Sequence, residues 1–512
     1  MGRDNFLSPL FNCEKGGIFL AQLNVTASQL AIIKQNIQQR YLKIELLNTN
    51  YQVVDSLEGV GINGSISIDS NSDMRRSATL KFIVKDSSFE VSPEGKVWLD
   101  KYIRLYLGIY SIEEQQVIYT KLGIFVIDAP SYEYDAVNNS IQMSLLDLMC
   151  KLSGLRNGYL PGLPVTIKAG ENIRKAMIDT LKLGGFTKYV CSDTGALPND
   201  LSFNQGSTIY TVLSGLRDIY PNYEIYFDVD GVFHYEPIPT GENEAVQIDD
   251  TLWGDIVIGE NNDVDFQNVK NSIEVYGRTH EPEFYCDNPT ILDNNTSYVY
   301  VLCPIAFTPT DYLDSIFGFK LKANTEVKST GIIFVIFYEA GTDYHLGVGG
   351  TLFSENDDYM RSITTYEDTY FCVKKYSRET ETSTTEGVKW LGRLQSYALV
   401  EDTNPDSPFY VNGSIGRIRL PLFGGNYDNC FTDNLAMQRA KYELYLHTRL
   451  QDTITLTCLP VPWLDVGVLV EYTLKRNNEK RQYIIQSISY GFDVDDTMSV
   501  TMHRYYPNYT II

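Results

Sequence analysis

Alternation of apolar and polar residues is the commonest pattern along this chain. It runs through short segments such as SATLKFIV, which are separated by turn-rich stretches. A period of two residues is typical of strands with one buried and one exposed face. Residues 41–150 are therefore predicted to form an antiparallel β module of barrel or sandwich type. They follow an N-terminal arm of residues 1–40, from which one helix is predicted over 26–41.

One sequence motif, which predicts a strand, a corner and a second strand, occurs twice in the chain. Ser131-Tyr132-x-Tyr134-Asp135 matches Ser489-Tyr490-x-Phe492-Asp493, and each follows an apolar run and precedes an alternating run. Each also lies downstream of a Trp-Leu-Asp triplet, at 98–100 and 463–465. Convergent strand patterning is the alternative, but the ordered set favours two copies of one β module. The second copy is assigned to residues 251–278 and 407–512.

The periodicity becomes helical within residues 151–250. Helices are predicted over 170–186, ended by Gly184-Gly185, and over 207–221, capped by Ser207 and stopped before Pro221. A hairpin follows, with Asp230-Gly231 at its tip, which is a strong short-range turn signal. This pattern predicts a small α+β domain.

Residues 279–406 are rich in strand patterns and in Asn, Thr, Ser, Asp and Gly. They are interpreted as a β-sandwich inserted into the second module, the alternative being more of one large β domain. The second module also contains a predicted helix at 432–449, capped by Thr432. The fold class expected is mainly β with an α+β portion.

Composition narrows the classes of function. The chain of 512 residues carries 65 acidic and 42 basic residues, for a net charge of −23, which disfavours bulk attraction to nucleic acid. Its eight cysteines are scattered, which is typical of buried thiols in a reduced, cytosol-assembled protein. We expect no signal peptide, and the longest apolar run, 331–338, is too short to span a bilayer.

The candidate chemistry is sparse. Asp228 and Asp230 lie beside His234, but the hairpin context favours a solvated turn. None of the five histidines has metal-site spacing, so no catalytic residue, cofactor or metal site is predicted. Met74-Arg75-Arg76 is a basic spot, interpreted either as pairing with acidic neighbours across an interface or as a solvated turn. Aromatic residues in the insert favour sandwich core, with sugar binding as the alternative; they include Tyr298, Tyr300, Phe334, Phe337 and Tyr338.

The ordered motifs resemble those of the baseplate hub proteins of tailed bacteriophages. The C-terminal set is LAMQRAKYEL, TITLTCLPVPWLDVGVLVEY and YIIQSISYGF, although Asp465-Val466-Gly467 alters the Gly-Asp order of that family. The N-terminal set includes RRSATLKFIV, WLDKYIRLYLGIY and LGIFVIDAPSYEYD, and GYLPG at 158–162 is similar to the linker domain of those proteins. The resemblance covers most of 41–277 and 407–512 but not the insert.

The resemblance implies a structural, non-enzymatic virion protein. It implies two tube-type β-barrel modules per chain and a homotrimer whose six barrels enclose a channel, through which genomic DNA passes without specific binding. Such a hub adapts a six-fold tail tube to a three-fold spike or fibre. Its implied partners are a tail tube or distal tail protein above, a spike, fibre or other baseplate protein below, and a tape measure protein. Assembly is expected in the host bacterial cytoplasm.

Two other functions stay open at this point. One is a tail-tip protein that binds host surface carbohydrate, or degrades cell wall, through residues 279–406. The other is an unrelated secreted carbohydrate-binding β-sandwich, against which the missing signal peptide argues.

Overall fold

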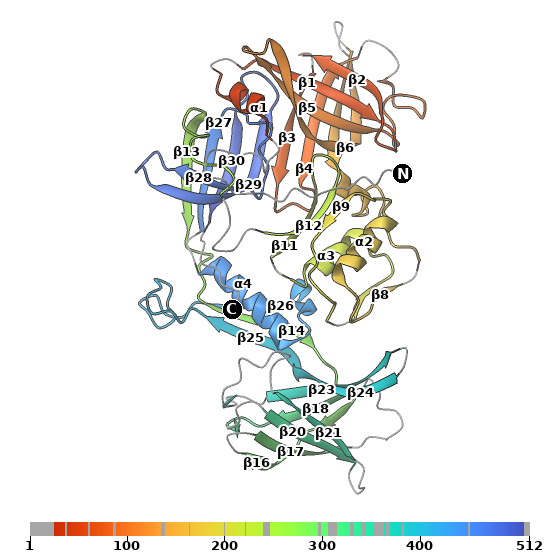
Figure 1. Cartoon of the computed structure of the whole chain (residues 1–512), viewed down its shortest axis with the longest axis vertical. Helices are drawn as coiled ribbons and strands as arrows, with labels where there is room; N and C mark the ends of the chain where they lie inside the picture. Colours follow the sequence, from red (N-terminus) through yellow and green to blue (C-terminus); the bar gives the residue numbers. More distant parts are fainter. Residues whose placement is uncertain are drawn as a thin grey trace, which may run out of the picture. The chain divides into compact units, whose positions relative to one another are not determined.

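The computed structural model divides the chain into two compact units, which are considered separately (Figure 1). Unit 1 comprises residues 1–147, 243–262 and 453–507, and unit 2 comprises residues 148–242, 263–452 and 508–512. The residues that the structure describes are 25–35, 38–59, 62–84, 89–134, 139–162, 164–198, 200–220, 222–238, 246–294, 298–305, 315–327, 332–339, 345–351, 363–364, 369–380, 383–448 and 451–505. Cys13, Asp135 and Ile37, which the sequence patterns include, lie outside these residues.

A twelve-stranded sheet forms the framework of unit 1. The strand order is β13-β27-β30-β29-β3-β4-β7-β6-β5-β1-β2, and β28 pairs with β29 off this path. From the first sequence copy come β1 (Arg40–Leu47), β2 (Val53–Gly59), β3 (Ile62–Asp69), β4 (Arg76–Ile83), β5 (Tyr102–Ser111), β6 (Gln116–Tyr134) and β7 (Asn139–Asp147). From the second come β13 (Val257–Asp265), β27 (Gln451–Cys458), β28 (Leu469–Thr473), β29 (Lys480–Gly491) and β30 (Met498–Arg504). The described strands of one chain thus form a path with two ends and not a closed barrel.

Alternating residues of these strands fill one hydrophobic core. Ile141, Met143 and Leu145 of β7 join the same buried cluster as Val500 and Met502 of β30. Because a fully buried aliphatic side chain stabilises a fold by about 1.5–3 kcal/mol, the two sequence copies support each other through this shared core.

The N-terminal helix is shorter than the sequence pattern predicts. Helix α1 spans Ala27–Ile33, starts at a capping box between Thr26 and Gln29, and buries Ile32 and Ile33. The prediction of a helix to residue 41 is wrong, because strand β1 begins at Arg40. The alternating RYLKIELL pattern prevails there over the helical spacing of Tyr41.

The first part of unit 2 is a small α+β layer. Helix α2 (Ile173–Leu183) is capped by Asn172 and followed by Gly185 at a φ of 82°, whereas α3 (Ile209–Arg217) is capped by Thr208. The prediction of Ser207 as that cap is wrong by one residue. The layer is completed by five strands, namely β8 (Val165–Ile167), β9 (Tyr189–Cys191), β10 (Leu201–Phe203), β11 (Tyr223–Phe227) and β12 (Phe233–Pro237). The β11–β12 hairpin turns at Asp230-Gly231, as predicted.

A second layer in unit 2 packs one helix on a three-stranded sheet. Strand β14 (Ser272–Thr279) lies between β25 (Gln395–Glu401), which is antiparallel, and β26 (Arg419–Phe423), which is parallel. Helix α4 (Asp433–His447) starts at Thr432 as predicted and buries Ala436 and Ala440 against this sheet. Residue 449, the last of the predicted helix, lies outside the described residues. Thus β14, assigned with 251–278 to the second module, lies in this sheet rather than in the twelve-stranded one.

The insert consists mainly of two four-stranded sheets. One has the order β15-β18-β23-β24 and the other β16-β17-β20-β21. Phe317 and Phe319 of β18 meet Phe337 of β20, with ring centroids 5.2 and 6.1 Å apart, so the two sheets pack face to face. The strands are β15 (Phe284–Cys286), β16 (Thr290–Asn294), β17 (Tyr298–Ile305), β18 (Ile316–Leu321), β20 (Ile332–Glu339), β21 (His345–Thr351), β23 (Thr369–Thr380) and β24 (Ser383–Arg393), beside the short pair β19 (Glu326–Val327) and β22 (Ile363–Thr364).

The chain is therefore mainly β with helices in a minority, as predicted. Among the residues described, we find no helix with the length and apolarity that crossing a membrane requires.

Candidate functional site: the junction of the two sequence copies

The two sequence copies meet where β29 pairs with β3. The ladder is antiparallel, with Ser489 opposite Ser67, Tyr490 opposite Ile66 and Gly491 opposite Ser65. The second copy of the Ser-Tyr-x-aromatic frame therefore lies directly on a strand of the first copy. This pairing makes the sheet continuous from β13 through to β6 (Figure 1).

The strand registers place the two copies of the frame at matching ladder positions. Ser131 of β6 faces Gln142 of β7, which faces Lys81 of β4. In the second copy the chain of partners is the same: Ser489 of β29, Ser499 of β30 and Thr457 of β27. The next row also corresponds, with Tyr132, Ile141 and Phe82 in the first copy and Tyr490, Met498 and Cys458 in the second. Strands β4, β7 and β6 thus correspond to β27, β30 and β29.

Arginines of the first copy bind the turn that carries the second Trp-Leu-Asp triplet. Arg76 is 2% exposed and its Nη2 forms an ion pair with Asp465 Oδ2. Arg75 is 5% exposed and its Nη2 donates a 3.0 Å hydrogen bond to the carbonyl of Val466. Arg75 and Arg76 are thus buried and bound to groups of the same chain, so the alternative of a solvated turn is wrong for these two residues. Pairing of the basic spot across an interface between chains stays a prediction. A buried charge pair whose partner is removed is costly, so these contacts fix how the copies meet.

Arg40 makes a second link that sequence reasoning missed. It is 5% exposed at the start of β1, and its Nη1 donates to the carbonyls of Asp493 and, at 2.9 Å, Asp496. Asn63 adds a 2.8 Å bond from Nδ2 to Asp493 Oδ2. Burial lowers the pKa of Arg40, an effect that the nearby carboxylates oppose. Single arginines before alternating strands are common, and no local signal marked this one.

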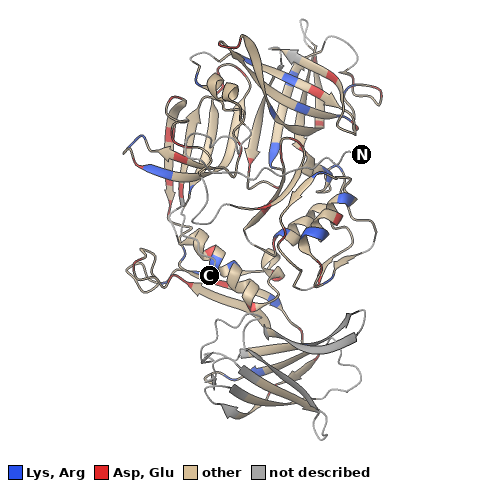
Figure 2. Cartoon of the chain, viewed as in Figure 1, with Lys and Arg blue, Asp and Glu red and all other residues tan. Residues whose placement is uncertain are grey.

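Small hydroxyl side chains cover one face of the joined sheet. A shallow hollow there is lined by the hydroxyl residues Ser65, Ser67, Thr457, Ser489, Thr497 and Ser499. Thr79 lies beside Ser65, with their hydroxyls 3.0 Å apart, and Thr455 lies 3.4 Å from Thr501. The segments 453–458, 482–491 and 498–503 contain no Lys, Arg, Asp or Glu, and Figure 2 shows how sparse charge is along these strands. In the second copy this face is polar and carries no charged side chain within those segments, whereas in the first copy Lys81 and Glu133 form an exposed ion pair on it. The opposite face packs into the core.

The two copies of the frame differ in burial. Tyr490 and Phe492 are each 4% exposed, and their rings meet at 6.1 Å. Tyr132 is 45% and Tyr134 is 81% exposed. Equivalent aromatic residues are thus covered at the junction with β3 and uncovered at the end of β6.

The α+β layer brings together an ionic cluster around His234. The Nε2 of His234 lies 3.2 Å from Asp228 Oδ2 and its Nδ1 lies 3.2 Å from Glu236 Oε2, and the ring stacks on Tyr226 at 4.9 Å. Burial opposes protonation, but the hydrogen bonds to both carboxylates prevail and raise the pKa of His234 to about 9. Its side chain is only 15% exposed, so the interpretation of a solvated turn is wrong for His234, while Asp230 lies at the hairpin tip. A histidinium held by two carboxylates is an ion-pair support and a poor general base near neutral pH.

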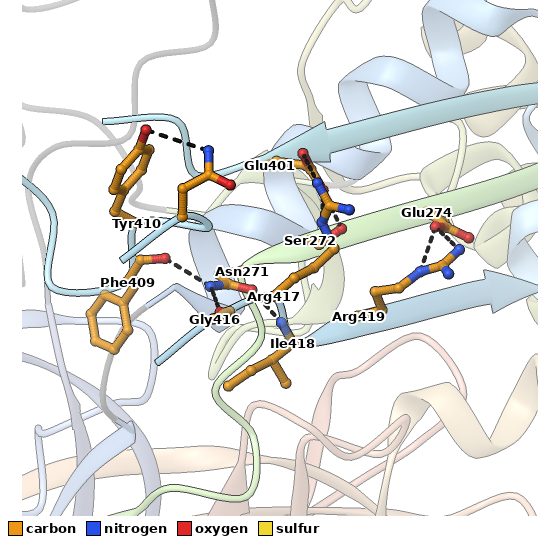
Figure 3. Close-up of polar contacts among 11 residues, drawn as sticks. Asn271, Ser272, Glu274, Glu401, Phe409, Tyr410, Gly416, Arg417, Ile418 and Arg419 are labelled. Atoms are coloured by element: carbon orange, nitrogen blue, oxygen red, sulfur yellow. Dashed lines mark hydrogen bonds and ion pairs between the residues drawn. The ribbon is translucent and has the colours of Figure 1, made fainter. Parts of the chain in front are cut away.

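A buried amide organises the loop that leads into the C-terminal region. Asn271, fully buried, donates from Nδ2 to the carbonyls of Phe409 (2.9 Å) and Gly416 (2.8 Å), and its Oδ1 accepts from Ile418 N at 2.6 Å (Figure 3). Nearby, Glu401 accepts from Ser272 and pairs with Arg417, while Arg419 pairs with Glu274 (Figure 3). These contacts hold residues 402–418 in one ordered conformation on the three-stranded sheet.

The insert aromatics divide between core and surface. Phe337 is fully buried, as the core interpretation predicts, whereas Phe334 is 39% exposed and lies 6.0 Å from the Tyr300 ring. Seven cysteines are buried free thiols, namely Cys150, Cys191, Cys286, Cys303, Cys372, Cys430 and Cys458. Within the described residues, no group of His, Cys, Asp and Glu is arranged to hold a metal ion.

Comparisons with known proteins give one family model and several solved structures. Residues 406–509 match a family model described as a domain of unknown function (DUF5048), and no curated protein matches the chain. The 43 kDa tail protein of prophage MuSo2 from Shewanella oneidensis is 12% identical with a TM-score of 0.47, covering 90% of this chain and 98% of that one. The prophage tail protein gp18 from Listeria monocytogenes is 11% identical with a TM-score of 0.43, covering 90% and 94%. The tail protein from Neisseria meningitidis is 9% identical with a TM-score of 0.46, covering 91% and 98%.

Proposed function

We propose that this chain is a structural virion protein, a homotrimeric hub at the baseplate or tail tip that encloses the DNA channel. In this proposal it adapts a six-fold tail tube to a three-fold spike or fibre and has no enzymatic activity. The observation that carries the proposal is the register-for-register duplication of β4, β7 and β6 in β27, β30 and β29. Two equivalent modules per chain give a trimer six similar modules, which can match a six-fold ring. The other domains occur once per chain and therefore three times in the trimer.

Each module, predicted at 41–150 and at 251–278 with 407–512, is proposed to act as one tube-type barrel of that ring. Three other parts are proposed to lie outside that ring, namely the α+β domain at 151–250, the arm at 1–40 and the insert at 279–406. The proposed partners are a tail tube or distal tail protein above, a spike, fibre or other baseplate protein below, and a tape measure protein. Assembly is proposed in the cytoplasm of the host bacterium.

We assign the hydroxyl face of the joined sheet to the channel wall. Every Lys or Arg that neutralises a phosphate holds DNA by releasing counterions, so a wall for sliding DNA should lack them. Serine and threonine hydroxyls keep the wall wet without adding positive charge. In the second copy, the absence of charge from segments 453–458, 482–491 and 498–503 supports this assignment. In the first copy, Lys81 on the same face is paired with Glu133, which offsets its charge. Net acidity elsewhere in the chain adds to the repulsion of DNA.

Native mass measured across a concentration series tests the trimer. We expect a trimer that persists at micromolar concentration and appears as a ring in electron micrographs. A monomer at every concentration would contradict the proposal for the isolated chain.

Added positive charge tests the channel wall. A variant with Ser67→Lys, Thr457→Lys and Ser489→Lys should retain duplex DNA in a salt-dependent manner, whereas the wild-type trimer should not. The matched control places three lysines at exposed sites of unit 2, as Leu155→Lys, Leu183→Lys and Val190→Lys. Equal DNA retention by both variants would show that charge alone, not the channel face, is responsible.

A second function is proposed for the insert, namely recognition of carbohydrate on the host surface. It is favoured by the exposed Phe334 beside Tyr300, because such rings can stack on the apolar face of a sugar. Full-length protein and its Phe334→Ala variant should differ in binding to a glycan array. Identical binding patterns, or none, would remove this function.

A further inference from the structure

We propose that the corner at 131–134 is a docking edge for strand β13 of a second copy of this chain. The inference rests on the proposed homotrimer and specifies the strands and the register through which the copies meet. It comes from the duplication itself, because the junction of β29 with β3 inside one chain is a template for the contact between chains.

The burial of the two corners indicates that something covers the first one. Tyr490 and Phe492 are each 4% exposed where β29 lies against β3, whereas Tyr132 and Tyr134 are 45% and 81% exposed. The same frame serves both places, and large aromatic residues on a strand edge favour association with another strand. A strand equivalent to β3 would cover the first corner in the same way.

Strand order identifies that missing strand as β13. On the outer side of β4 lies β3, and on the outer side of β27, the counterpart of β4, lies β13. Within one chain β13 ends the sheet, so it pairs with β27 on one side only in the described order. The described ladder between β6 and β5 stops at Val126, which leaves 131–134 paired with β7 alone in that order. Ile258 of β13 is 64% exposed, so both edges present apolar side chains.

The template also gives the register. A Cβ built on Gly259 would lie 3.7 Å from Thr457 Cβ, so Gly259 lies across from Thr457 as Asn63 lies across from Lys81. Gly259 then corresponds to Asn63, and Asn261 corresponds to Ser65. Because Gly491 faces Ser65 in the internal junction, its counterpart Glu133 should face Asn261 of the next copy.

Charge disfavours one of the two neighbouring registers. With Glu133 opposite Asn261, the side chain facing Asp263 is that of Ser131, so no carboxylate lies directly opposite another. A slip of two residues in one direction keeps the same faces but sets Glu133 against Asp263, and like charges directly opposite on adjacent strands are destabilising. The slip in the other direction sets Glu133 against Gly259, and only the template distinguishes it from the proposed register.

Disulfide trapping tests the pairing. Directly opposite residues on antiparallel strands have Cβ atoms about 4.5–5.5 Å apart, close enough for oxidation to join cysteines. The double variant Glu133→Cys/Asn261→Cys should give covalent dimers and trimers on denaturing gels after mild oxidation. Ser67→Cys/Ser489→Cys is the positive control, because it should close within one chain and leave the denatured mass unchanged. Glu133→Cys/Gly259→Cys, two residues out of register, should link chains at least fivefold less.

A charge on the docking edge gives an independent readout. Tyr134→Glu should raise the trimer dissociation constant at least tenfold, while Leu155→Glu, at an exposed residue of unit 2, should not. Val54→Glu tests the other end of the sheet, β2, where Val54 is 51% exposed. A trimer that forms without the 133–261 link and resists Tyr134→Glu would overturn the edge assignment and leave the hub function standing. A chain that is monomeric throughout would overturn the hub function itself.

Discussion

Two copies of one short frame lie in the same sheet, and only one of them is covered. At 489–492 the aromatic residues are buried where β29 pairs with β3 of the first module, and at 131–134 they are exposed. The residues are chemically alike, and Tyr132 and Tyr490 sit at equivalent ladder positions. The difference therefore arises from the neighbouring strand and not from the frame.

This comparison teaches how a duplicated module can serve both folding and assembly. The internal junction is secured by Arg40, Arg75 and Arg76, which bind backbone and carboxylate groups of the second copy. Removing one partner of such a buried contact leaves an uncompensated charge or polar group, which is destabilising. The outer corner has the same strand chemistry and leaves its partner to be supplied by another chain.

The largest expected effect is at the buried corner. Tyr490→Ala should lower the free energy of unfolding of unit 1 by about 4 kcal/mol, because it empties a large buried site. Tyr134→Ala, at the exposed corner, should change the stability of the monomer by less than about 0.5 kcal/mol. Denaturant unfolding of dilute protein measures both.

Tyr490→Phe is the matched control for that pair. The Tyr490 hydroxyl has no hydrogen-bond partner among the described residues, so its removal should be close to neutral. Equal losses for Tyr490→Ala and Tyr134→Ala would mean that the two corners are equivalent in the monomer after all.

A somewhat smaller effect is expected when one residue of the arginine clamp, formed by Arg40, Arg75 and Arg76, is replaced. Arg76→Ala should cost about 3 kcal/mol, because it removes the partner of Asp465 and a largely buried side chain. Lys81→Ala breaks an exposed pair with Glu133 and should cost less than about 1 kcal/mol. Hydrogen exchange at Ser489 and Tyr490 should accelerate in Arg76→Ala only. Unchanged exchange there would show that the clamp does not hold the junction.

The sequence predicted the repeat because its signal is local. The Ser-Tyr-x-aromatic frame and the strands that flank it lie within a few residues of one another, and the ladder registers match that frame. The helix cap at Thr432 of α4 and the turn at Asp230-Gly231 were predictable for the same reason. Local chemistry decides such features, so one sequence is enough to find them.

Long-range pairings were beyond the sequence. The parallel pairing of β14 with β26 joins strands that are separated in the sequence by the whole insert. Neither strand has a sequence pattern that predicts which strand it pairs with. The hydrogen bonds from Arg40 to the turn after β29 likewise join residues far apart in the sequence. Helix 26–41 was predicted too long because helical spacing and the alternation of β1 overlap at Tyr41, and sheet pairing with β5 decided between them.

The smallest expected effect is a change of stability with pH. It tests whether unit 2 unfolds independently of the two corners in unit 1. Because the folded pKa of His234 is about 9, above the unfolded value of about 6.5, its ion pairs stabilise fully below pH 6.5 and lose their effect as pH rises through 9. The α+β layer should therefore lose about 2 kcal/mol between pH 6 and pH 9.5, and His234→Gln should remove most of that dependence. Thermal unfolding across this pH range measures it, with Asp230→Asn at the same hairpin as the control that keeps the wild-type slope. Because Tyr490 and the arginine clamp lie in unit 1, Tyr490→Ala should shift the unfolding of unit 1 and leave the pH slope unchanged. If Tyr490→Ala flattens that slope, the two units unfold together, and the burial of a corner cannot be measured apart from the rest of the chain.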